Sequence, residues 1–191
     1  MKVGMNQRKG ISQAMTTSIS NGRLRQRFAK WDTDGSGGLE RADFEQEAMR
    51  IATAFGAKPQ SREAKTLRDA FRNLFDFHAR EAGVPTSGAV SEDDFVRINE
   101  KLMFTDGEAN FNRVLRPVMQ ALVGLCDRNT DGMISQEEFT AWLTGVGVDE
   151  AKARQAFIQI DSDNDGALSV DELLAAVRNF HYGKLDVPLL G

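Results

Sequence analysis

Two twelve-residue acidic stretches, residues 127–138 and 161–172, constrain this chain more than any other part of its sequence. Their first residues, Asp127 and Asp161, lie 34 residues apart. In both stretches, oxygen-bearing side chains occupy positions 1, 3, 5 and 9, a glycine position 6, an aliphatic residue position 8 and a glutamate position 12. A hard divalent cation takes about six to eight oxygen ligands, which alternate residues of a tight loop can supply. The spacing therefore predicts two cation-binding loops, each followed by a helix.

The pattern is that of the EF-hand loop, in which every ligand has a fixed place. The side chains at positions 1, 3 and 5 each bind with one oxygen, and the backbone carbonyl of position 7 adds another. Position 9 binds directly or through water, and the glutamate at position 12 binds with both carboxylate oxygens. Gly132 and Gly166, at position 6, allow the chain to bend around the ion. Two full matches at the spacing of a helical hairpin favour calcium loops over two unrelated acidic turns.

A third acidic stretch, residues 32–43, follows an expected amphipathic helix whose apolar stripe is formed by Leu24, Phe28 and Trp31. It keeps the same pattern except at position 12, where Asp43 replaces glutamate. Because aspartate is one methylene shorter, it reaches an ion less easily with both oxygens. We therefore expect this stretch to bind calcium more weakly, with magnesium as a competitor.

A fourth stretch, residues 83–94, keeps the frame of the loop but not its ligands. Gly83 and Pro85 stand at positions 1 and 3, so too few oxygens remain to bind a cation. EF-hand loops pair through a short antiparallel contact at position 8. We therefore predict an empty loop whose Val90 faces Leu39 and braces the first acidic stretch.

In chain order, we call these stretches loop 1 (32–43), loop 2 (83–94), loop 3 (127–138) and loop 4 (161–172). They predict an all-α fold of four EF-hands in two pairs, compact, with short antiparallel contacts between paired loops. In the second pair, Ile134 is expected to face Leu168. The chain then divides into a flexible basic leader (1–19), an N-terminal EF-hand pair (20–104), a C-terminal pair (108–181) and an apolar tail folded onto the core (182–191).

Composition limits the classes of protein that the chain can represent. With 191 residues, 41% of them hydrophobic and 27% charged, it is typical of a globular protein. The single cysteine, Cys126, allows no internal disulfide and fits a reducing compartment, so we expect a cytoplasmic location. We expect no membrane span, secretory signal or lipid anchor. No catalytic pairing of serine or cysteine with histidine is indicated, and the acidic residues are accounted for as ligands, so we expect no enzyme activity.

The net charge of −4 is unevenly distributed. Residues 1–31 hold seven basic side chains and no acidic one, whereas loops 1, 3 and 4 carry −3, −3 and −5. A basic stretch of this kind either contacts nucleic acid or a membrane, or is simply solvated. We favour the solvated alternative and expect no nucleic-acid or membrane partner. Without metal, the crowded carboxylates repel by about 1 kcal/mol or more per pair, so we expect the chain to fold on binding calcium.

From about Thr17 onward, the chain resembles the sarcoplasmic calcium-binding proteins, a family of EF-hand proteins. The resemblance rests on loops 1, 3 and 4, the empty loop 2, Phe111 and Pro117 in the helix before loop 3, and the apolar ending 185–191. It implies a compact, monomeric protein with three bound calcium ions that acts mainly as an intracellular calcium buffer. The resemblance also assigns ligands to positions 1, 3, 5, 7, 9 and 12 of the three acidic loops. These are Asp32, Asp34, Ser36, Gly38, Glu40, Asp43, Asp127, Asn129, Asp131, Met133, Ser135, Glu138, Asp161, Asp163, Asp165, Ala167, Ser169 and Glu172.

Two functions fit such a protein, a calcium buffer and a calcium sensor. A sensor opens on binding calcium and grips a target helix, commonly with flexible methionines. Of the seven methionines, only Met49, Met103 and Met119 are placed to line a groove, and the apolar stripes are rich in phenylalanine. We therefore favour a buffer or transporter of calcium; the alternative is a sensor that exposes a groove and regulates a protein partner.

Overall fold

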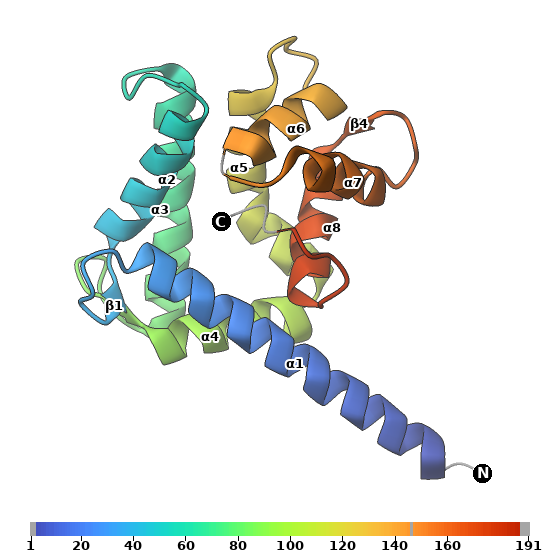
Figure 1. The fold of residues 1–191 in the computed structure, drawn as a ribbon. Helices are drawn as coiled ribbons and strands as arrows, with labels where there is room; N and C mark the ends of the chain where they lie inside the picture. Colours follow the sequence, from blue (N-terminus) through green and yellow to red (C-terminus); the bar gives the residue numbers. More distant parts are fainter. Residues whose placement is uncertain (1–2, 146, 188–191) are drawn as a thin grey trace.

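The computed structural model describes residues 3–145 and 147–187. These residues form eight α-helices, one π-helical turn and four two-residue strands (Figure 1). In chain order the elements are α1 (Val3–Trp31), β1 (Gly38–Leu39), α2 (Arg41–Ala54), α3 (Arg62–Ala82), β2 (Val90–Ser91), α4 (Glu92–Glu100), η1 (Lys101–Thr105), α5 (Glu108–Cys126), β3 (Ile134–Ser135), α6 (Gln136–Gly145), α7 (Glu150–Ile160), β4 (Ala167–Leu168) and α8 (Val170–His181). The predicted all-α fold is confirmed. None of the described helices is long and apolar enough to cross a bilayer.

Two small antiparallel sheets join the loops in pairs. β1 pairs with β2 and places Leu39 opposite Val90, and β3 pairs with β4 and places Ile134 opposite Leu168. Both predicted contacts are confirmed. All four side chains are 0% exposed, so each sheet is anchored in the core by the aliphatic residue at position 8 of its loops.

Capping residues fix the ends of several helices, as α3 illustrates. The hydroxyl of Ser61 accepts a hydrogen bond from the Ala64 N–H at 3.1 Å and caps the start of the helix. Gly83 ends it in the left-handed conformation, with φ of 73°. Between these ends, Phe71 and Phe75 lie one turn apart and are completely buried. The helix thus ends at position 1 of loop 2, on a glycine that adopts the left-handed conformation but has no side-chain oxygen to bind a cation.

Aromatic side chains fill the core of each pair and join the two pairs together. In the N-terminal pair, the Trp31 ring centroid lies 4.9 Å from that of Phe44 and 6.1 Å from that of Phe95. Between the pairs, the rings of Phe55 and Trp142 lie 6.1 Å apart, and α3 packs along α5. The buried apolar residues form one cluster, so the two pairs share a single core.

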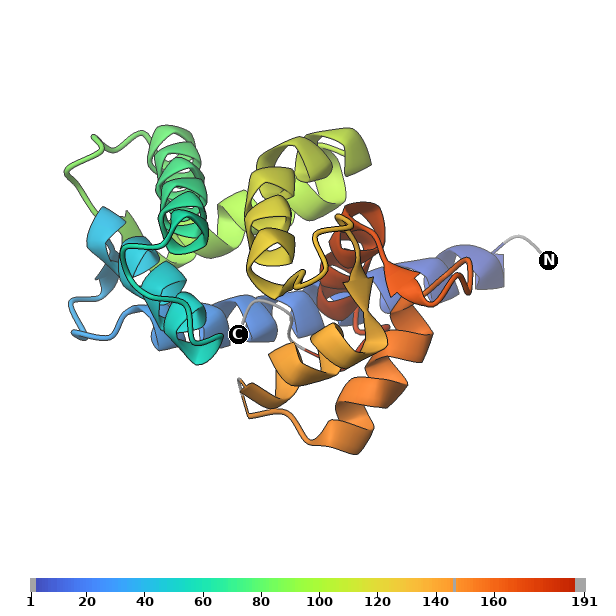
Figure 2. The same ribbon diagram turned by 90° about the horizontal axis from the view of Figure 1, so that it is seen from above.

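Helix α1 corrects one expectation. We expected residues 1–19 to be a flexible leader, but α1 begins at Val3, and residues 3–19 are helical. No proline lies in α1, so a helix anchored by the buried Leu24 and Trp31 extends toward the N-terminus, through Gly22 and Gly10. As Figures 1 and 2 show, α1 runs along one side of both pairs, contacting α4 and α8.

The described part of the C-terminal tail packs against the core. Leu185 is 5% exposed and Val187 is 9% exposed. Arg23 of α1 holds this segment: it donates hydrogen bonds to the carbonyl oxygens of Phe180 and of Leu185, the latter at 2.9 Å, and pairs with Asp186 at 3.0 Å. The remaining residues of the predicted tail, 188–191, lie outside the described residues.

Candidate metal centres

Loops 1, 3 and 4 share one backbone conformation, which loop 2 lacks. Positions 4 and 6 are left-handed in all three: the φ values are 67° and 81° at Gly35 and Gly37, 60° and 82° at Thr130 and Gly132, and 59° and 85° at Asn164 and Gly166. A residue other than glycine in this conformation is held there by its surroundings at a cost of about 1 kcal/mol or more. In loop 2, Thr86 and Gly88 at the same positions are not left-handed. The four loops therefore differ in shape as well as in ligands.

Backbone amides hold the acidic side chains of the three loops in place. In each loop the position 6 N–H donates to the position 1 carboxylate: Gly37 to Asp32 at 3.0 Å, Gly132 to Asp127 at 2.8 Å and Gly166 to Asp161 at 3.2 Å. The position 5 N–H likewise donates to the oxygen at position 3, over 3.0–3.2 Å. These shared bonds aim the side chains at positions 1 and 3 toward the same point of each loop.

Loop 4 shows most directly that a cation of calcium's size fits. One oxygen from each of Asp161, Asp163 and Asp165 lies within 4.8 Å of the others. Two oxygens bound to the same calcium ion lie at most about 5 Å apart, since each Ca–O distance is about 2.3–2.6 Å. The residues present therefore fit calcium, which when bound would supply the positive charge that these carboxylates lack.

The glutamates at position 12 reach across their loops. One oxygen of Glu138 accepts the Arg128 N–H at 2.7 Å and the other accepts the Ser135 N–H at 2.9 Å, which joins positions 2 and 9. Burial alone would raise the pKa of Glu138, but the bonds from Ser135 and Arg128 outweigh it, and the pKa lies below its ordinary value. The carboxylate is thus kept charged, as a metal ligand must be.

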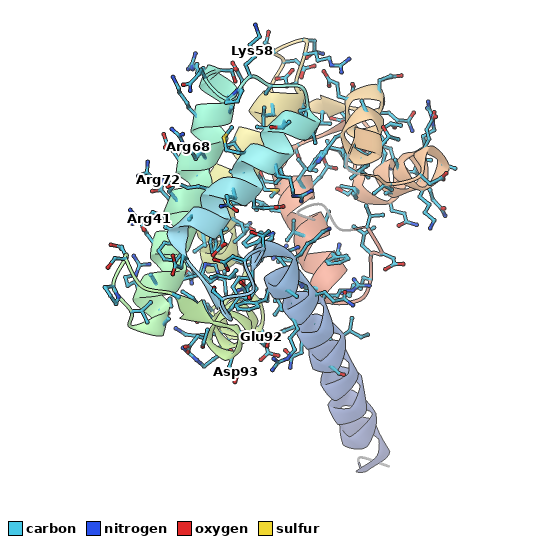
Figure 3. The ribbon with its side chains drawn as sticks, turned by 60° about the vertical axis from the view of Figure 1, so that its left-hand side comes forward. Arg41, Lys58, Arg68, Arg72, Glu92 and Asp93 are labelled. Carbon is cyan, nitrogen blue, oxygen red and sulfur yellow. The ribbon has the colours of Figure 1, made fainter. Side chains whose placement is uncertain are left out.

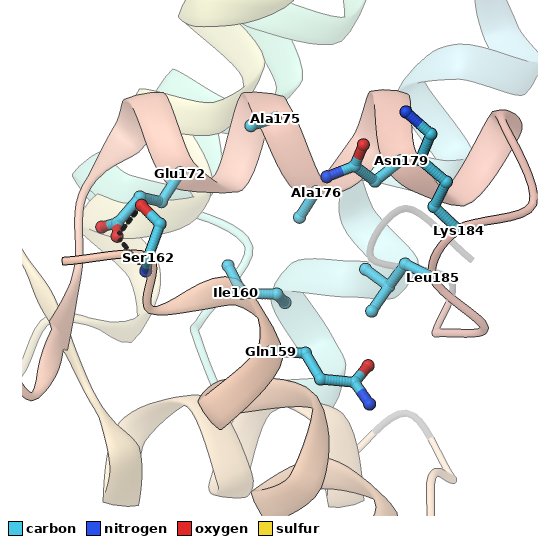
Figure 4. A pocket seen from close by; sticks show the side chains of 9 residues that line it. All are labelled: Gln159, Ile160, Ser162, Glu172, Ala175, Ala176, Asn179, Lys184 and Leu185. Carbon is cyan, nitrogen blue, oxygen red and sulfur yellow. Dashed lines mark hydrogen bonds between the residues drawn. The ribbon is translucent and has the colours of Figure 1, made fainter. Parts of the chain in front are cut away.

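Glu172 repeats this arrangement in loop 4. Its oxygens accept the N–H groups of Ser162 at 2.8 Å and Ser169 at 2.9 Å, and its pKa is likewise lowered, because these bonds outweigh burial. Figure 4 shows the bonds from Ser162 to Glu172 beside a pocket of about 190 Å³ that extends to Leu185 of the tail. Sequence reasoning assigned Glu172 but gave no role to Ser162, whose hydroxyl also donates to it at 2.9 Å.

Asp43, at position 12 of loop 1, does not reach across. Its carboxylate accepts the Glu40 N–H at 2.7 Å, and it accepts no hydrogen bond from Thr33, which is at position 2. Burial raises the pKa of Asp43, and the nearby charges of Asp34 and Asp32 raise it further. The shorter side chain of Asp43 therefore bonds to position 9 of loop 1 but not to position 2, whereas Glu138 bonds to both positions of loop 3.

In loop 2, the position 12 carboxylate is occupied by the chain itself. The Arg97 guanidinium donates to one oxygen of Asp94 at 2.6 Å, and the Ser91 hydroxyl donates to the other at 2.7 Å. The hydrogen bonds from Arg97 and then Ser91 hold the pKa of Asp94 below its ordinary value. The Gly88 N–H donates to the Pro85 carbonyl at 2.8 Å, which closes a tight turn where the other loops open around their carboxylates.

Several known proteins are similar to this chain in sequence. The family model for the EF-hand domain matches residues 152–183. Calerythrin of Saccharopolyspora erythraea is 54% identical over 177 residues, which are 93% of this chain and 100% of calerythrin. The luciferin-binding protein of Renilla reniformis is 29% identical over 163 residues, covering 84% of this chain and 85% of that protein.

Solved structures agree. A calcium-binding protein of Streptomyces coelicolor, 27% identical, superposes with a TM-score of 0.67 and covers 85% of this chain and 98% of its own. Calcium-loaded apo-aequorin of Aequorea victoria, at 22% identity, shares the fold, with a TM-score of 0.70 and coverage of 90% and 93%. The chain therefore belongs to the sarcoplasmic-type group of EF-hand proteins that includes calerythrin, a group of calcium-binding proteins and not of enzymes.

Proposed function

We propose that the protein binds three calcium ions, one each in loops 1, 3 and 4. The ligands are the residues at positions 1, 3, 5, 7, 9 and 12 that the sequence assigns, with the backbone carbonyl acting at Gly38, Met133 and Ala167. The observation that carries this proposal is the geometry that these three loops share and loop 2 lacks: left-handed positions 4 and 6, and a position 1 carboxylate held by the position 6 N–H. Loop 1, closed by Asp43, is the one in which magnesium competes best.

We further infer that the protein is a monomeric, cytoplasmic calcium buffer that folds as it binds. Among the residues whose side chains the structure describes, which are Thr16 and those from Ser18 to Gly145 and Gly147 to Val187, large apolar side chains are exposed only at Ile19, Phe104 and Ile158, which lie on three different elements. The tail residues Leu185 and Val187 are buried against the core. A protein that grips a target helix needs a larger, continuous apolar surface. This distribution supports a buffer.

A sensor is the second candidate. The Streptomyces coelicolor protein, which matches this fold along 85% of the chain, is a calcium-binding protein that acts in prokaryotic calcium-mediated regulation. In a sensor, calcium would separate the helices of a pair and expose apolar surface to a partner.

One experiment separates the two candidates. The full chain is titrated with calcium in the presence of 8-anilinonaphthalene-1-sulfonate, a dye that fluoresces on exposed apolar surface, while calorimetry and circular dichroism follow the same titration. A buffer that folds on binding should take up three ions, gain helix and release the dye. Dye binding that rises with calcium would favour the sensor, and fewer than three ions would contradict the three-loop assignment.

A further inference from the structure

We propose that Arg97 takes the place of a metal ion in the second EF-hand and so preorganises loop 1 for calcium. This inference rests on the proposed function, because it requires that loop 1 binds calcium. It assigns a positioning role to a residue that contacts no ligand of the ion directly. A chain of contacts runs from Arg97 through Asp94 and Ser91 to the backbone of loop 1.

The first contacts lie within the second hand. Arg97 of α4 donates to Asp94 at 2.6 Å, and the other oxygen of Asp94 accepts the Ser91 hydroxyl at 2.7 Å. The same Ser91 oxygen accepts the Asp94 N–H at 3.2 Å and caps α4. In loops 3 and 4 the position 12 carboxylate is placed to meet an ion; in loop 2 it meets a guanidinium.

The last contact crosses to loop 1. Ser91 lies opposite Gly38 in the antiparallel pair of β1 and β2. Gly38 is position 7 of loop 1, whose carbonyl is an expected calcium ligand, and that carbonyl accepts the Ser36 hydroxyl at 2.9 Å. Holding Ser91 in place therefore helps to hold a ligand of the neighbouring loop in place, whether or not calcium is present.

Of the four hands, only the second has a basic side chain three residues after position 12 of its loop. Arg97 lies three residues after position 12, on the next turn of the outgoing helix, where its side chain can return to the position 12 carboxylate. The corresponding residues of the other hands are Gln46, Ala141 and Ala175, none of which carries a charge. An arginine thus occurs at this place only in the hand that lacks metal ligands.

The other acidic side chains of loop 2 are also paired. Glu92 and Asp93, labelled in Figure 3, each lie 3.1 Å from the guanidinium of Arg25 on α1. This tether has a counterpart in the C-terminal pair, where Arg116 of α5 pairs with Asp171 of loop 4. A contact between an arginine and the acidic residues at the end of a loop therefore occurs in both pairs. The pair of Arg97 and Asp94 is the additional contact in loop 2, where no metal ion is expected.

The charge of Arg97 and its proposed positioning role lead to opposite predictions for the calcium affinity of loop 1 when Arg97 is removed. As a cation near loop 1, Arg97 repels calcium, so its removal should tighten binding if charge alone matters. If Arg97 positions β2, its removal should weaken binding. The Arg97 and Asp94 side chains are 55% and 36% exposed, and a pair of this exposure changes an equilibrium by about two- to five-fold.

The test uses Trp31, which is 3% exposed and directly precedes Asp32, as a fluorescent reporter of loop 1. In a Trp142→Phe background of the full chain, calcium is titrated into the parent and Arg97→Gln, with Arg97→Lys as the conservative variant. Arg154→Gln is the matched control, because Arg154 is also a half-exposed arginine paired within its helix, to Glu150, but lies on α7. Calorimetry follows loops 3 and 4.

We expect Arg97→Gln to weaken calcium binding at loop 1 by about two- to five-fold, and both Arg97→Lys and Arg154→Gln to bind as the parent does. Loops 3 and 4 should be unaffected. Unchanged or tighter binding in Arg97→Gln would overturn the inference. Absence of calcium binding at loop 1 in the parent would reject the proposed function of that loop, and the inference with it.

A second variant covers the case in which Arg97→Gln does not fold. Ser91→Ala breaks the next contact in the chain without changing the charge, so it should also weaken loop 1. Calcium-free hydrogen exchange at the Leu39 and Val90 amides provides a further measurement. Exchange should be faster in Ser91→Ala than in the parent, and equal rates would overturn the inference.

Discussion

The two EF-hand pairs have the same sheet register but hold their loops together differently. In the C-terminal pair, loops of charge −3 and −5 lie side by side, and both end in a glutamate that spans its loop. In the N-terminal pair, one loop of charge −3 lies beside a loop whose three acidic side chains contact arginines. If loops 3 and 4 bind calcium as proposed, metal ions neutralise the acidic side chains of the C-terminal pair, whereas the chain's own arginines neutralise those of loop 2. The C-terminal pair should then depend more on calcium for its order.

The largest effect is expected for Glu172→Gln, in the pair that depends most on metal. This change replaces the proposed charged ligand with a neutral amide, whose single oxygen can accept only one of the N–H bonds from Ser162 and Ser169. Even outer contacts of a metal site are worth about 10- to 100-fold in affinity, so we expect loop 4 to lose about 100-fold or more. Loop 3 should weaken too, because Ile134 and Leu168 pair across the sheet.

Calorimetric stoichiometry measures this effect. The number of tightly bound ions should fall from three to two or fewer in Glu172→Gln. Glu137→Gln, which removes an exposed acidic charge at position 11 of loop 3, is the control and should keep three. If Glu172→Gln also kept three ions with unchanged affinities, the assignment of this residue as a ligand would be wrong.

A second prediction concerns the sheet of the N-terminal pair. A Cβ atom added at Gly38 would lie 2.8 Å from the Cβ of Ala89, so β1 and β2 would have to separate. At the same position of loop 4, Ala167 has a side chain. We therefore expect Gly38→Ala to lower the free energy of unfolding by about 1–3 kcal/mol, as overpacked sites generally do.

Thermal unfolding in calcium checks the effect of Gly38→Ala. A loss of this size should lower the Tm by about 2–4 °C per kcal/mol in a chain of this length. The double variant Gly38→Ala, Ala89→Gly removes the obstructing methyl and should recover much of the loss. If the double variant were no more stable than Gly38→Ala, close packing of the strands would not be the reason for glycine here.

The smallest effect is expected for Asp43→Glu, which gives loop 1 the closing residue of loops 3 and 4. The longer side chain should reach the Thr33 N–H as Glu138 reaches that of Arg128. We expect calcium to bind loop 1 about ten-fold more tightly, equivalent to about 1.4 kcal/mol, and magnesium to bind less well. Titrations with and without magnesium measure both; equal affinities in the parent and the variant would count against our interpretation of Asp43.

Much of this fold could be predicted because the EF-hand loop is a local motif with long-range consequences. The residues at position 8 were enough to predict both sheet registers, since Leu39, Val90, Ile134 and Leu168 each stand at the same place in their loops. The lack of ligands in loop 2 could also be predicted, because Pro85 has no side-chain oxygen to bind a cation.

Other features depend on contacts that no local pattern encodes. The extent of α1 was underestimated, because residues 3–19 lack an apolar stripe of their own. The pairing of Arg23 with Asp186 joins residues 163 positions apart, so only the folded chain reveals it. An alignment of the four outgoing helices would show that only Arg97 is charged at its position, but it would not show the contact of Arg97 with Asp94.

The bond from Arg23 to the tail has a consequence for any partner that would bind the surface covered by the tail. A segment tethered beside the surface that it covers competes for that surface at an effective concentration on the order of millimolar. A target peptide present at about micromolar concentration would therefore have to bind roughly a thousand-fold more tightly than the segment around Leu185 in order to displace it. By holding that segment, Arg23 sets the threshold that a foreign helix has to exceed.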